Sequence, residues 1–158
     1  MAQHNGLSVQ LSDLINCLSN TIDLVSPELA DHHNRVGLVA YALACQLGLP
    51  EEAGVDLYFA GKLHDIGALS LTDRVRLMQF DGGETHQHAE TGALLLEMFS
   101  PLARIGELVR FHHVRWDHGA GAFQRGREVP LGSHILHLAD RISVLIGTID
   151  GVNTGQSS

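Results

Sequence analysis

Histidine and aspartate are the residues in this sequence that could do chemistry, and they fall in short groups along the chain. The sequence holds 11 histidines, and histidine is both the commonest metal ligand and the side chain best matched to proton transfer near neutral pH. The most compact group is His64-Asp65, within Leu-His-Asp-Ile-Gly. Neighbours on a helix point about 100° apart, so both side chains can reach one ion only near a helix end. Alone, such a pair is more often a surface or capping feature than a metal site.

A second group precedes this pair. Glu28 and His32 are spaced i, i+4 and therefore share one helix face. An apolar stripe that includes Val36 and Leu43 lies near that face, so His32 is expected to point inward and the adjacent His33 to be rotated to the surface. The alternative for Glu28 and His32 is an exposed hydrogen-bonded pair.

The C-terminal half of the chain adds further candidates. His112-His113 follows a mostly apolar stretch, where two adjacent histidines can bind one ion or simply be solvated. Asp140 lies in an apolar helical stretch and must find a partner, because burying a lone carboxylate is costly. Arg141 is not expected to be that partner, since adjacent residues on a helix do not face each other. Spacing alone does not favour His88 over His86.

These candidates lie on a chain whose apolar residues recur at helical spacing, which predicts an all-α fold. Strand signals are weak, and Gly and Pro separate the helical stretches. The expected helices cover residues 9–24, 27–47, 51–65, 75–80, 86–99, 102–113 and 130–146. Residues 119–128, rich in Gly and Arg, are expected to form a loop.

Composition narrows the class of protein. The 158 residues suffice for one compact domain with its own core. The net charge of −8 argues against a DNA or RNA polymer as partner, since phosphate neutralisation needs clustered basic groups. There is no apolar run of about 20 residues to cross a bilayer, and residues 1–5 do not resemble a signal peptide. Cys17 and Cys45 form no CxxC unit and fit a reducing compartment. A cytoplasmic protein with no membrane partner is expected.

Taken together, the groups resemble the HD-GYP subgroup of HD-domain phosphohydrolases. The matching residues are Glu28, His32-x-x-Arg35-Val36, His64-Asp65-Ile66-Gly67, His88-x-x-x-Gly92, His112-His113-Val114-Arg115-Trp116-Asp117, Val129-Pro130 and Ala139-Asp140. The resemblance implies a compact bundle of about six to seven helices that hydrolyses cyclic di-GMP, a bacterial second messenger. It also implies an HD domain over residues 25–147, between an N-terminal helix over residues 1–24 that could end a connector and a flexible tail over residues 148–158.

The resemblance further implies a role for each group. Asp65 would bridge two metal ions and take part in catalysis. The first ion would also be held by His32, His64 and Asp140, and the second by His88, His112 and His113. Glu28 matches a carboxylate that holds a third ion in some members. The resemblance thereby selects His88 over His86 and His32 over His33.

The chemistry of these residue types agrees with that implication. The candidate ligands offer imidazole nitrogen or carboxylate oxygen and no thiolate, which suits two or three divalent transition-metal ions, with iron or manganese favoured and zinc, nickel or cobalt as alternatives. Two such ions about 3.5–4 Å apart can bridge a water, lower its pKa and aim the hydroxide at phosphorus. They would also neutralise an anionic substrate.

Two departures from the family pattern affect substrate contacts. The lysine that usually follows His-Asp-x-Gly is replaced by Ala68, and no Gly-Tyr-Pro follows Asp117. Lys62 is near in sequence but is expected to point elsewhere. Arg115 is the surviving candidate for a catalytic contact to substrate phosphate, and His118 is a second candidate for substrate binding. Both could equally be solvated loop residues.

Three functions stay open at this point. The first is a cyclic dinucleotide phosphodiesterase, the second a nucleotide phosphatase, and the third a non-catalytic HD module that binds a signalling partner or a nucleotide. The complete second histidine group favours the first function, whereas the loss of the lysine and of Gly-Tyr-Pro favours the third. A sensor or other signalling protein is a further candidate partner, and the sequence does not set the oligomeric state.

Overall fold

Most of the chain that the structure describes is helical. The computed structural model describes residues 8–24, 31–68 and 85–154, with side-chain surroundings up to Gly147. The α-helices are α1 (Leu11–Asp23), α2 (His32–Gln46), α3 (Glu51–Leu63), α5 (Thr85–Glu97), α6 (Ala103–Arg110) and α7 (Leu131–Thr154). Short pieces complete the fold: the 3-10 helices η2 (Ser100–Leu102) and η3 (Asp117–Ala122), and the strands β1 (Phe123–Gln124) and β2 (Arg127–Glu128). The predicted all-α fold is confirmed.

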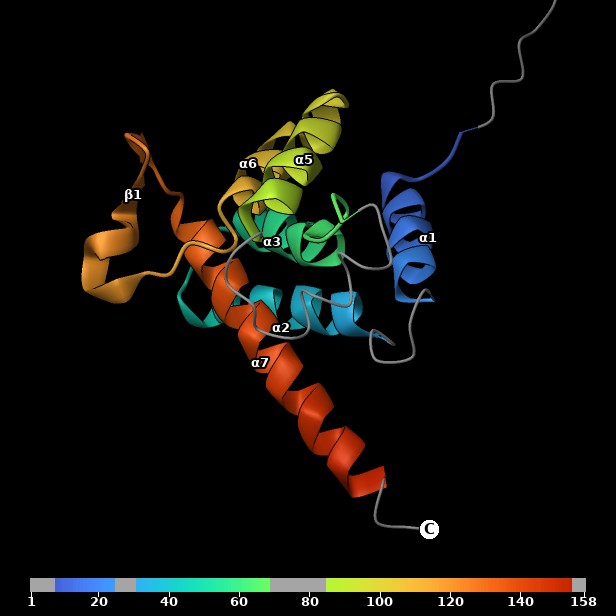
Figure 1. Cartoon of the computed structure of the whole chain (residues 1–158). Helices are drawn as coiled ribbons and strands as arrows, with labels where there is room; N and C mark the ends of the chain where they lie inside the picture. Colours follow the sequence, from blue (N-terminus) through green and yellow to red (C-terminus); the bar gives the residue numbers. More distant parts are fainter. Residues whose placement is uncertain (1–7, 25–30, 69–84, 155–158) are drawn as a thin grey trace, which may run out of the picture.

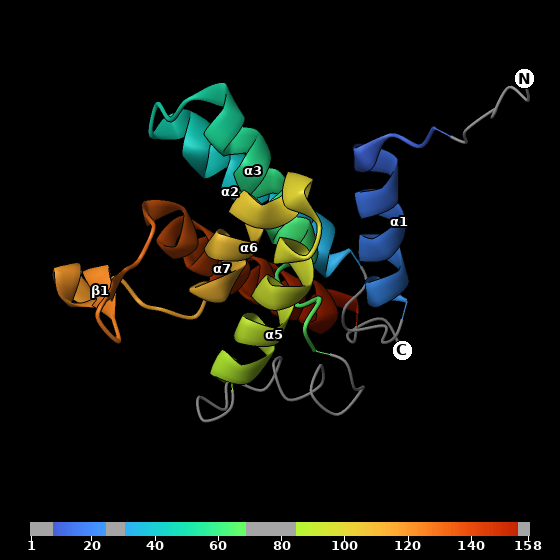
Figure 2. The ribbon, with the colours of Figure 1, turned by 90° about the horizontal axis from the view of Figure 1, so that it is seen from above.

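The helices form two side-by-side pairs that meet a long crossing helix. Helix α2 packs along α3, and α5 packs along α6 (Figures 1 and 2). Helix α7 packs against α2, and its C-terminal part extends away from the other helices in Figure 1. Helix α1 lies at the edge and contacts both α2 and α3. Within the described residues no helix is long and apolar enough to cross a membrane.

The main apolar core lies where these helices meet, and Phe111, Val114 and Val129 form a smaller second cluster. The larger buried members of the main core are Ile15, Val36, Leu57, Leu63, Val109 and Leu136. Burying a side chain of this size contributes about 1.5–3 kcal/mol. All six α-helices, α1, α2, α3, α5, α6 and α7, contribute residues to this core. The core therefore fixes the positions of the helix ends that carry the polar candidates.

The pairing of α2 with α3 depends on two glycines. A Cβ on Gly61 of α3 would lie 2.5 Å from the Cα of Gly37 of α2, so the two backbones touch where neither residue has a side chain. This contact sets the start of α2 beside the end of α3. The imidazole rings of His32 and His64 consequently lie 5.5 Å apart between centroids.

Three differences between the observed and the predicted elements bear on the site or on the ends of the fold. Helix α3 ends at Leu63, so His64 and Asp65 lie just beyond it. Residues 119–128 form η3 and a small β-hairpin, whose turn is built by positive φ angles at Arg125 and Gly126. Helix α7 continues to Thr154, beyond the predicted end at residue 146, because the glycines at 147 and 151 each cost a helix only about 1 kcal/mol. The flexible tail expected over residues 148–158 stays a prediction. The predicted helix over residues 75–80 lies outside the described residues.

Candidate metal centre

Asp65 lies in a tight turn at the end of α3. The Ile66 amide donates to the Leu63 carbonyl at 3.0 Å, and the Ala68 amide donates to the Asp65 carbonyl at 2.9 Å. This turn sets Nε2 of His64 at 3.2 Å from Oδ2 of Asp65. The two side chains therefore converge where a helix ends, as the sequence analysis required of an adjacent pair.

Gly67 allows α5 to approach this turn. A Cβ on Gly67 would lie 2.0 Å from the carbonyl oxygen of His88 and 2.4 Å from the amide nitrogen of Gly92. The backbone of α5 thus rests directly on the turn, and Nε2 of His88 reaches to 3.3 Å from Oδ1 of Asp65. Gly67 of the His-Asp-x-Gly motif and Gly92 of the His-x-x-x-Gly motif thus contact each other through their backbones, and this contact brings His88 to Asp65.

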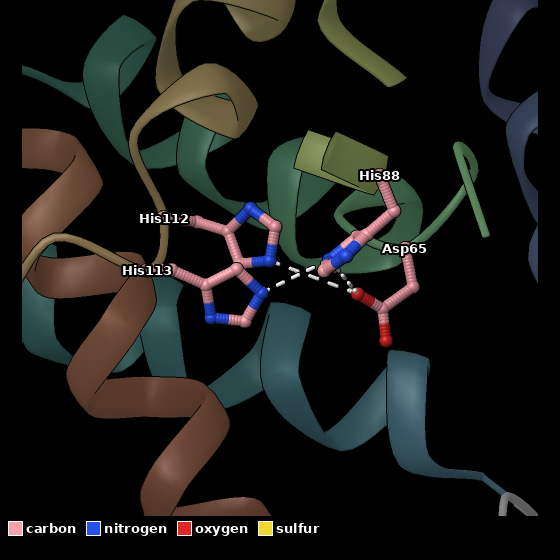
Figure 3. A group of neighbouring side chains, drawn as sticks. All are labelled: Asp65, His88, His112 and His113. Atoms are coloured by element: carbon pink, nitrogen blue, oxygen red, sulfur yellow. Dashed lines mark hydrogen bonds and ion pairs between the residues drawn. The ribbon is translucent and has the colours of Figure 1, made fainter. Parts of the chain in front are cut away.

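His112 and His113 complete this side of the cluster from the turn that follows α6. Nε2 of His112 lies 3.7 Å from Oδ1 of Asp65, and Nε2 of His113 lies 2.9 Å from Nε2 of His88. Figure 3 shows His88 and His112 facing one oxygen of the Asp65 carboxylate, with His113 directed at His88 and the other oxygen directed away. The four side chains form one potential ligand group.

The opposite side of the cluster is formed by His32 of α2, His64 and Asp140 of α7. Nε2 of His32 lies 3.4 Å from Oδ1 of Asp140, and Nε2 of His64 lies 3.9 Å from the same oxygen. All three residues are at most 2% exposed. Since Oδ2 of Asp65 faces His64 and Oδ1 faces His88 and His112, the Asp65 carboxylate stands between two ligand groups.

Backbone carbonyls fix the orientation of two of the rings. Nδ1 of His64 pairs with the Gly61 carbonyl at 2.9 Å, and Nδ1 of His112 pairs with the Val109 carbonyl at 2.7 Å. A histidine that donates from Nδ1 to a carbonyl presents Nε2 as the metal-binding atom. Both Nε2 atoms face Asp65, so the surrounding backbone prepares them for coordination.

The spacing of these atoms fits metal ions better than it fits hydrogen bonds. Nitrogen and oxygen ligands lie about 2.0–2.2 Å from a transition metal, so neighbouring ligands are about 3–3.4 Å apart and opposite ones about 4.2 Å. The carboxylate–imidazole distances here run from 3.2 to 3.9 Å, whereas N–H···O bonds favour 2.7–3.2 Å. Oδ1 of Asp65 and Nε2 of His112 are buried without a hydrogen-bond partner. The residues present fit two divalent ions.

Electrostatics in the cluster leaves the carboxylates charged. Burial alone would raise the pKa of Asp65, but the charge of His64 and the polar rings of His112 and His88 that face the carboxylate hold it well below its usual value. The pKa of Asp140 is likewise lowered, against its burial, by His32, His64 and Arg141. Burial disfavours protonated His64, yet the two carboxylates outweigh it and raise the pKa of His64 to about 9. The carboxylate pair thus favours a positive charge at this position.

On the other side of Asp65, two of the histidines are kept neutral. Burial, together with neighbouring rings of like charge, lowers the pKa of His113 far below its usual value and also lowers that of His112. Neutral imidazole is the form that coordinates a metal. These two ligands therefore need no deprotonation near neutral pH.

The structure describes two of the three remaining predicted site residues. Glu28 falls outside the described residues. Arg115 and His118 are exposed on the segment after His113. Ala68 is fully buried. Lys62 points elsewhere, as expected, because its Nζ donates to Oδ1 of Asn34 at 2.9 Å.

The expectation that His33 lies at the surface is wrong. His33 is 1% exposed, and its Nδ1 pairs with the carboxylate of Asp23. The reason is that α1 packs against α2 and places Asp23 beside this ring. Neither Asp23 nor the burial of His33 could be inferred from periodicity within α2 alone.

The expectation that Arg141 would not pair with Asp140 is also wrong. Nε of Arg141 lies 3.1 Å from Oδ2 of Asp140. The long, flexible arginine side chain folds back beside its own backbone, which the direction of the Cα–Cβ bond does not prevent. Sequence reasoning also missed His137, whose Nδ1 pairs with the His112 carbonyl at 3.0 Å. Its i, i+3 spacing to Asp140 was the available signal.

Comparison with known proteins agrees with this arrangement. A family model described as the HD domain matches residues 29–145. The chain belongs to the HD-domain family. The matched region begins within the segment before α2 and ends within α7, so this HD domain contains every described histidine and aspartate of the cluster, whereas α1 and its Asp23 precede it.

Two relatives of this HD domain come from bacteria. It is 31% identical over 149 residues to a cyclic di-GMP phosphodiesterase of Thermotoga maritima, covering 87% of this chain and 39% of that protein. It is 29% identical over 139 residues to 3'3'-cGAMP-specific phosphodiesterase 1 of Vibrio cholerae, covering 87% of this chain and 32% of that protein. The chain therefore spans between a third and two fifths of the length of these relatives.

Proposed function

We propose that this HD domain is a metal-dependent phosphohydrolase of the HD-GYP type, which cleaves a phosphodiester bond of a cyclic dinucleotide in bacterial signalling. The observation that carries the proposal is the position of Asp65, whose two carboxylate oxygens face two separate groups of buried histidines. Such an arrangement suits a carboxylate that bridges two divalent ions. Iron or manganese remains the favoured metal, and the nitrogen and oxygen ligands also suit zinc, nickel or cobalt.

Each part of the cluster has a role in this proposal. Two divalent ions bound there would lower the pKa of a water and offset phosphate charge. His32, His64 and Asp140 would hold one ion, and His88, His112 and His113 the other, with Asp65 shared. The enclosing helices would keep bulk water away, which strengthens electrostatic interactions in the site. Glu28 keeps its proposed place as a ligand of a third ion.

Substrate contacts are proposed for cationic side chains at the edge of the cluster. Arg141 is half-buried and its guanidinium pairs with Oδ2 of Asp140, one of the carboxylates that would hold the first ion. Arg115 and His118 are exposed on the segment after His113 and keep their proposed roles as phosphate contacts. The named activities of the relatives favour a cyclic dinucleotide as substrate, either cyclic di-GMP or cGAMP.

Metal content and hydrolysis, measured on one preparation, test the proposal. Protein purified without chelator should carry about two transition-metal ions per chain and should hydrolyse a cyclic dinucleotide faster than a generic phosphodiester. Chelation should abolish hydrolysis, and manganese or iron should restore it. A chain that binds no metal, or that binds metal and hydrolyses no phosphodiester, would refute the proposed activity.

A non-catalytic HD module is the second candidate, and one observation favours it. Ala68 occupies the place of the family lysine and is fully buried, so no cation reaches substrate from that position. In that case the protein would bind metal and a cyclic dinucleotide but release no product. Calorimetric binding combined with product analysis distinguishes the two functions.

A further inference from the structure

The strongest unassigned feature is the buried pair of Asp23 and His33. Nδ1 of His33 pairs with the Asp23 carboxylate of α1, while Nε2 of the same ring is buried and has no hydrogen-bond partner. That Nε2 atom lies 4.0 Å from Oδ2 of Asp65. A buried, unpartnered nitrogen directed at a carboxylate is costly unless something binds it.

The arrangement matches the way proteins orient metal-binding histidines. A ligating imidazole almost always donates its other ring N–H to a carboxylate or a carbonyl, and a carboxylate partner raises the basicity of the ligand. Asp23 supplies that carboxylate for His33, as the carbonyls of Gly61 and Val109 supply the partner for His64 and His112. His33 is therefore prepared for coordination in the same way as the proposed ligands.

The spacing also suits one ion. His33, His64 and Asp65 each offer a ligand atom, and these atoms lie within 4.8 Å of one another. The distance of 4.0 Å between Nε2 of His33 and Oδ2 of Asp65 approaches the value of about 4.2 Å for ligands on opposite sides of an ion. His64 belongs both to this group and to the group of His32 and Asp140. Because Nε2 of His64 has one lone pair, it can bind only one ion, so the two groups would have to share that ion.

We propose that His33 is an additional ligand of the first metal ion and that Asp23 of α1 positions it. The ion would then be held by three imidazoles and two carboxylates, from His32, His33, His64, Asp65 and Asp140. The inference rests on the proposed metal dependence and goes beyond it, because α1 precedes the matched HD domain. Any movement that withdraws α1 from α2 would remove the support of His33 and weaken the first ion.

Metal binding by chelator-treated protein tests this inference without an activity assay. Cobalt is titrated into wild type, His33→Gln and Asp23→Asn, with affinity measured by calorimetry and coordination followed by the visible absorption of bound cobalt. We expect Asp23→Asn to weaken one of the two binding events by about 10–100-fold, as for other outer partners of ligands. His33→Gln should weaken the same event at least as much and change the cobalt spectrum.

Matched controls separate coordination from folding. Asp13→Asn removes a carboxylate from the exposed first turn of the same helix, and His86→Gln removes an exposed histidine. Both should bind cobalt as wild type does. Circular dichroism of the chelator-treated proteins identifies any variant that fails to fold, and Asp23→Asn then carries the test if His33→Gln does not fold.

The outcomes are distinguishable. If both variants fold and bind two ions with unchanged affinity and spectrum, His33 is a structural histidine and the inference is overturned. If wild type itself binds no cobalt, the proposed metal dependence fails instead.

Discussion

The cluster around Asp65 and the segment that directly follows its His113 differ in burial and in backbone structure. His32, His64 and His112 in the cluster are at most 2% exposed, whereas Trp116 and Phe123 in the segment are 52% and 66% exposed. The cluster is held by helix ends and by backbone contacts at glycine. The segment is held by tight turns, with positive φ angles at Asp117, His118 and Arg125 that non-glycine residues adopt at a cost.

This difference assigns different tasks to the two regions. The buried cluster is assembled from α2, α5, α7 and the turns after α3 and α6. It tolerates few substitutions and therefore suits metal binding, a task that members of one family can share. An exposed segment can vary without disturbing the core, so it suits recognition of a particular substrate. Substitutions in the cluster should therefore affect metal content and activity together, and substitutions in the segment should affect substrate affinity alone.

The largest effect is expected for Asp65→Ala. Both ions should be lost because the shared carboxylate disappears. Removing an outer partner of a ligand costs about 10–100-fold in metal affinity or activity, and we expect hydrolysis to fall by more than that. Metal analysis and a cyclic dinucleotide assay check this, with the exposed Asp13→Asn as the control. Retention of both ions in Asp65→Ala would show that Asp65 does not bridge them.

Gly67→Ala tests the contact that brings α5 to the cluster. The added methyl group would collide with the His88 carbonyl, which lies 2.0 Å from the Cβ position, so α5 must move. We expect a loss of about 1–3 kcal/mol in the free energy of unfolding and preferential loss of the second ion. Thermal melting and metal analysis measure the two effects. An unchanged metal content would mean that His88 does not depend on this contact.

The two sides of Asp65 should respond differently to pH. In chelator-treated protein the raised pKa of His64 stabilises the fold below about pH 6.5, and this contribution is lost as pH rises through about 9. Metal must displace the same proton, so the first ion should bind about tenfold more tightly per pH unit across that window. The second ion should change less, because the pKa of His113 is lowered. Calorimetric metal titrations at several pH values check this prediction. If the affinities of the two ions changed equally with pH, the difference between the two sides of Asp65 would be refuted.

The smallest effect is expected for Arg115→Ala in the exposed segment. Exposed ion pairs contribute about 0.2–1 kcal/mol, so KM for a cyclic dinucleotide should rise by a few-fold while the metal content stays at the wild-type value. Arg125→Ala, also exposed in this segment, is the matched control. Loss of metal in Arg115→Ala would contradict the separation of tasks between the two regions.

Sequence patterns predicted the elements better than the contacts between them. Helical spacing gave the all-α class, and α5 and α7 begin within one residue of the predicted starts at residues 86 and 130. The burial of His33 was missed because it depends on α1 packing against α2, a contact that no period within α2 encodes. The pairing of Arg141 with Asp140 was missed because the arginine side chain can fold back along its own helix. His137 was overlooked although its spacing from Asp140 placed both on one face.

The metal content of His88→Ala tests most directly whether Asp65 stands between two separately held ions. His88 contacts only the Oδ1 side of the carboxylate, at 3.3 Å, so its removal leaves His32, His64 and Asp140 in place. The account predicts a folded protein that keeps about one ion per chain where wild type holds about two. Loss of both ions, or retention of both, in a folded His88→Ala protein would contradict it.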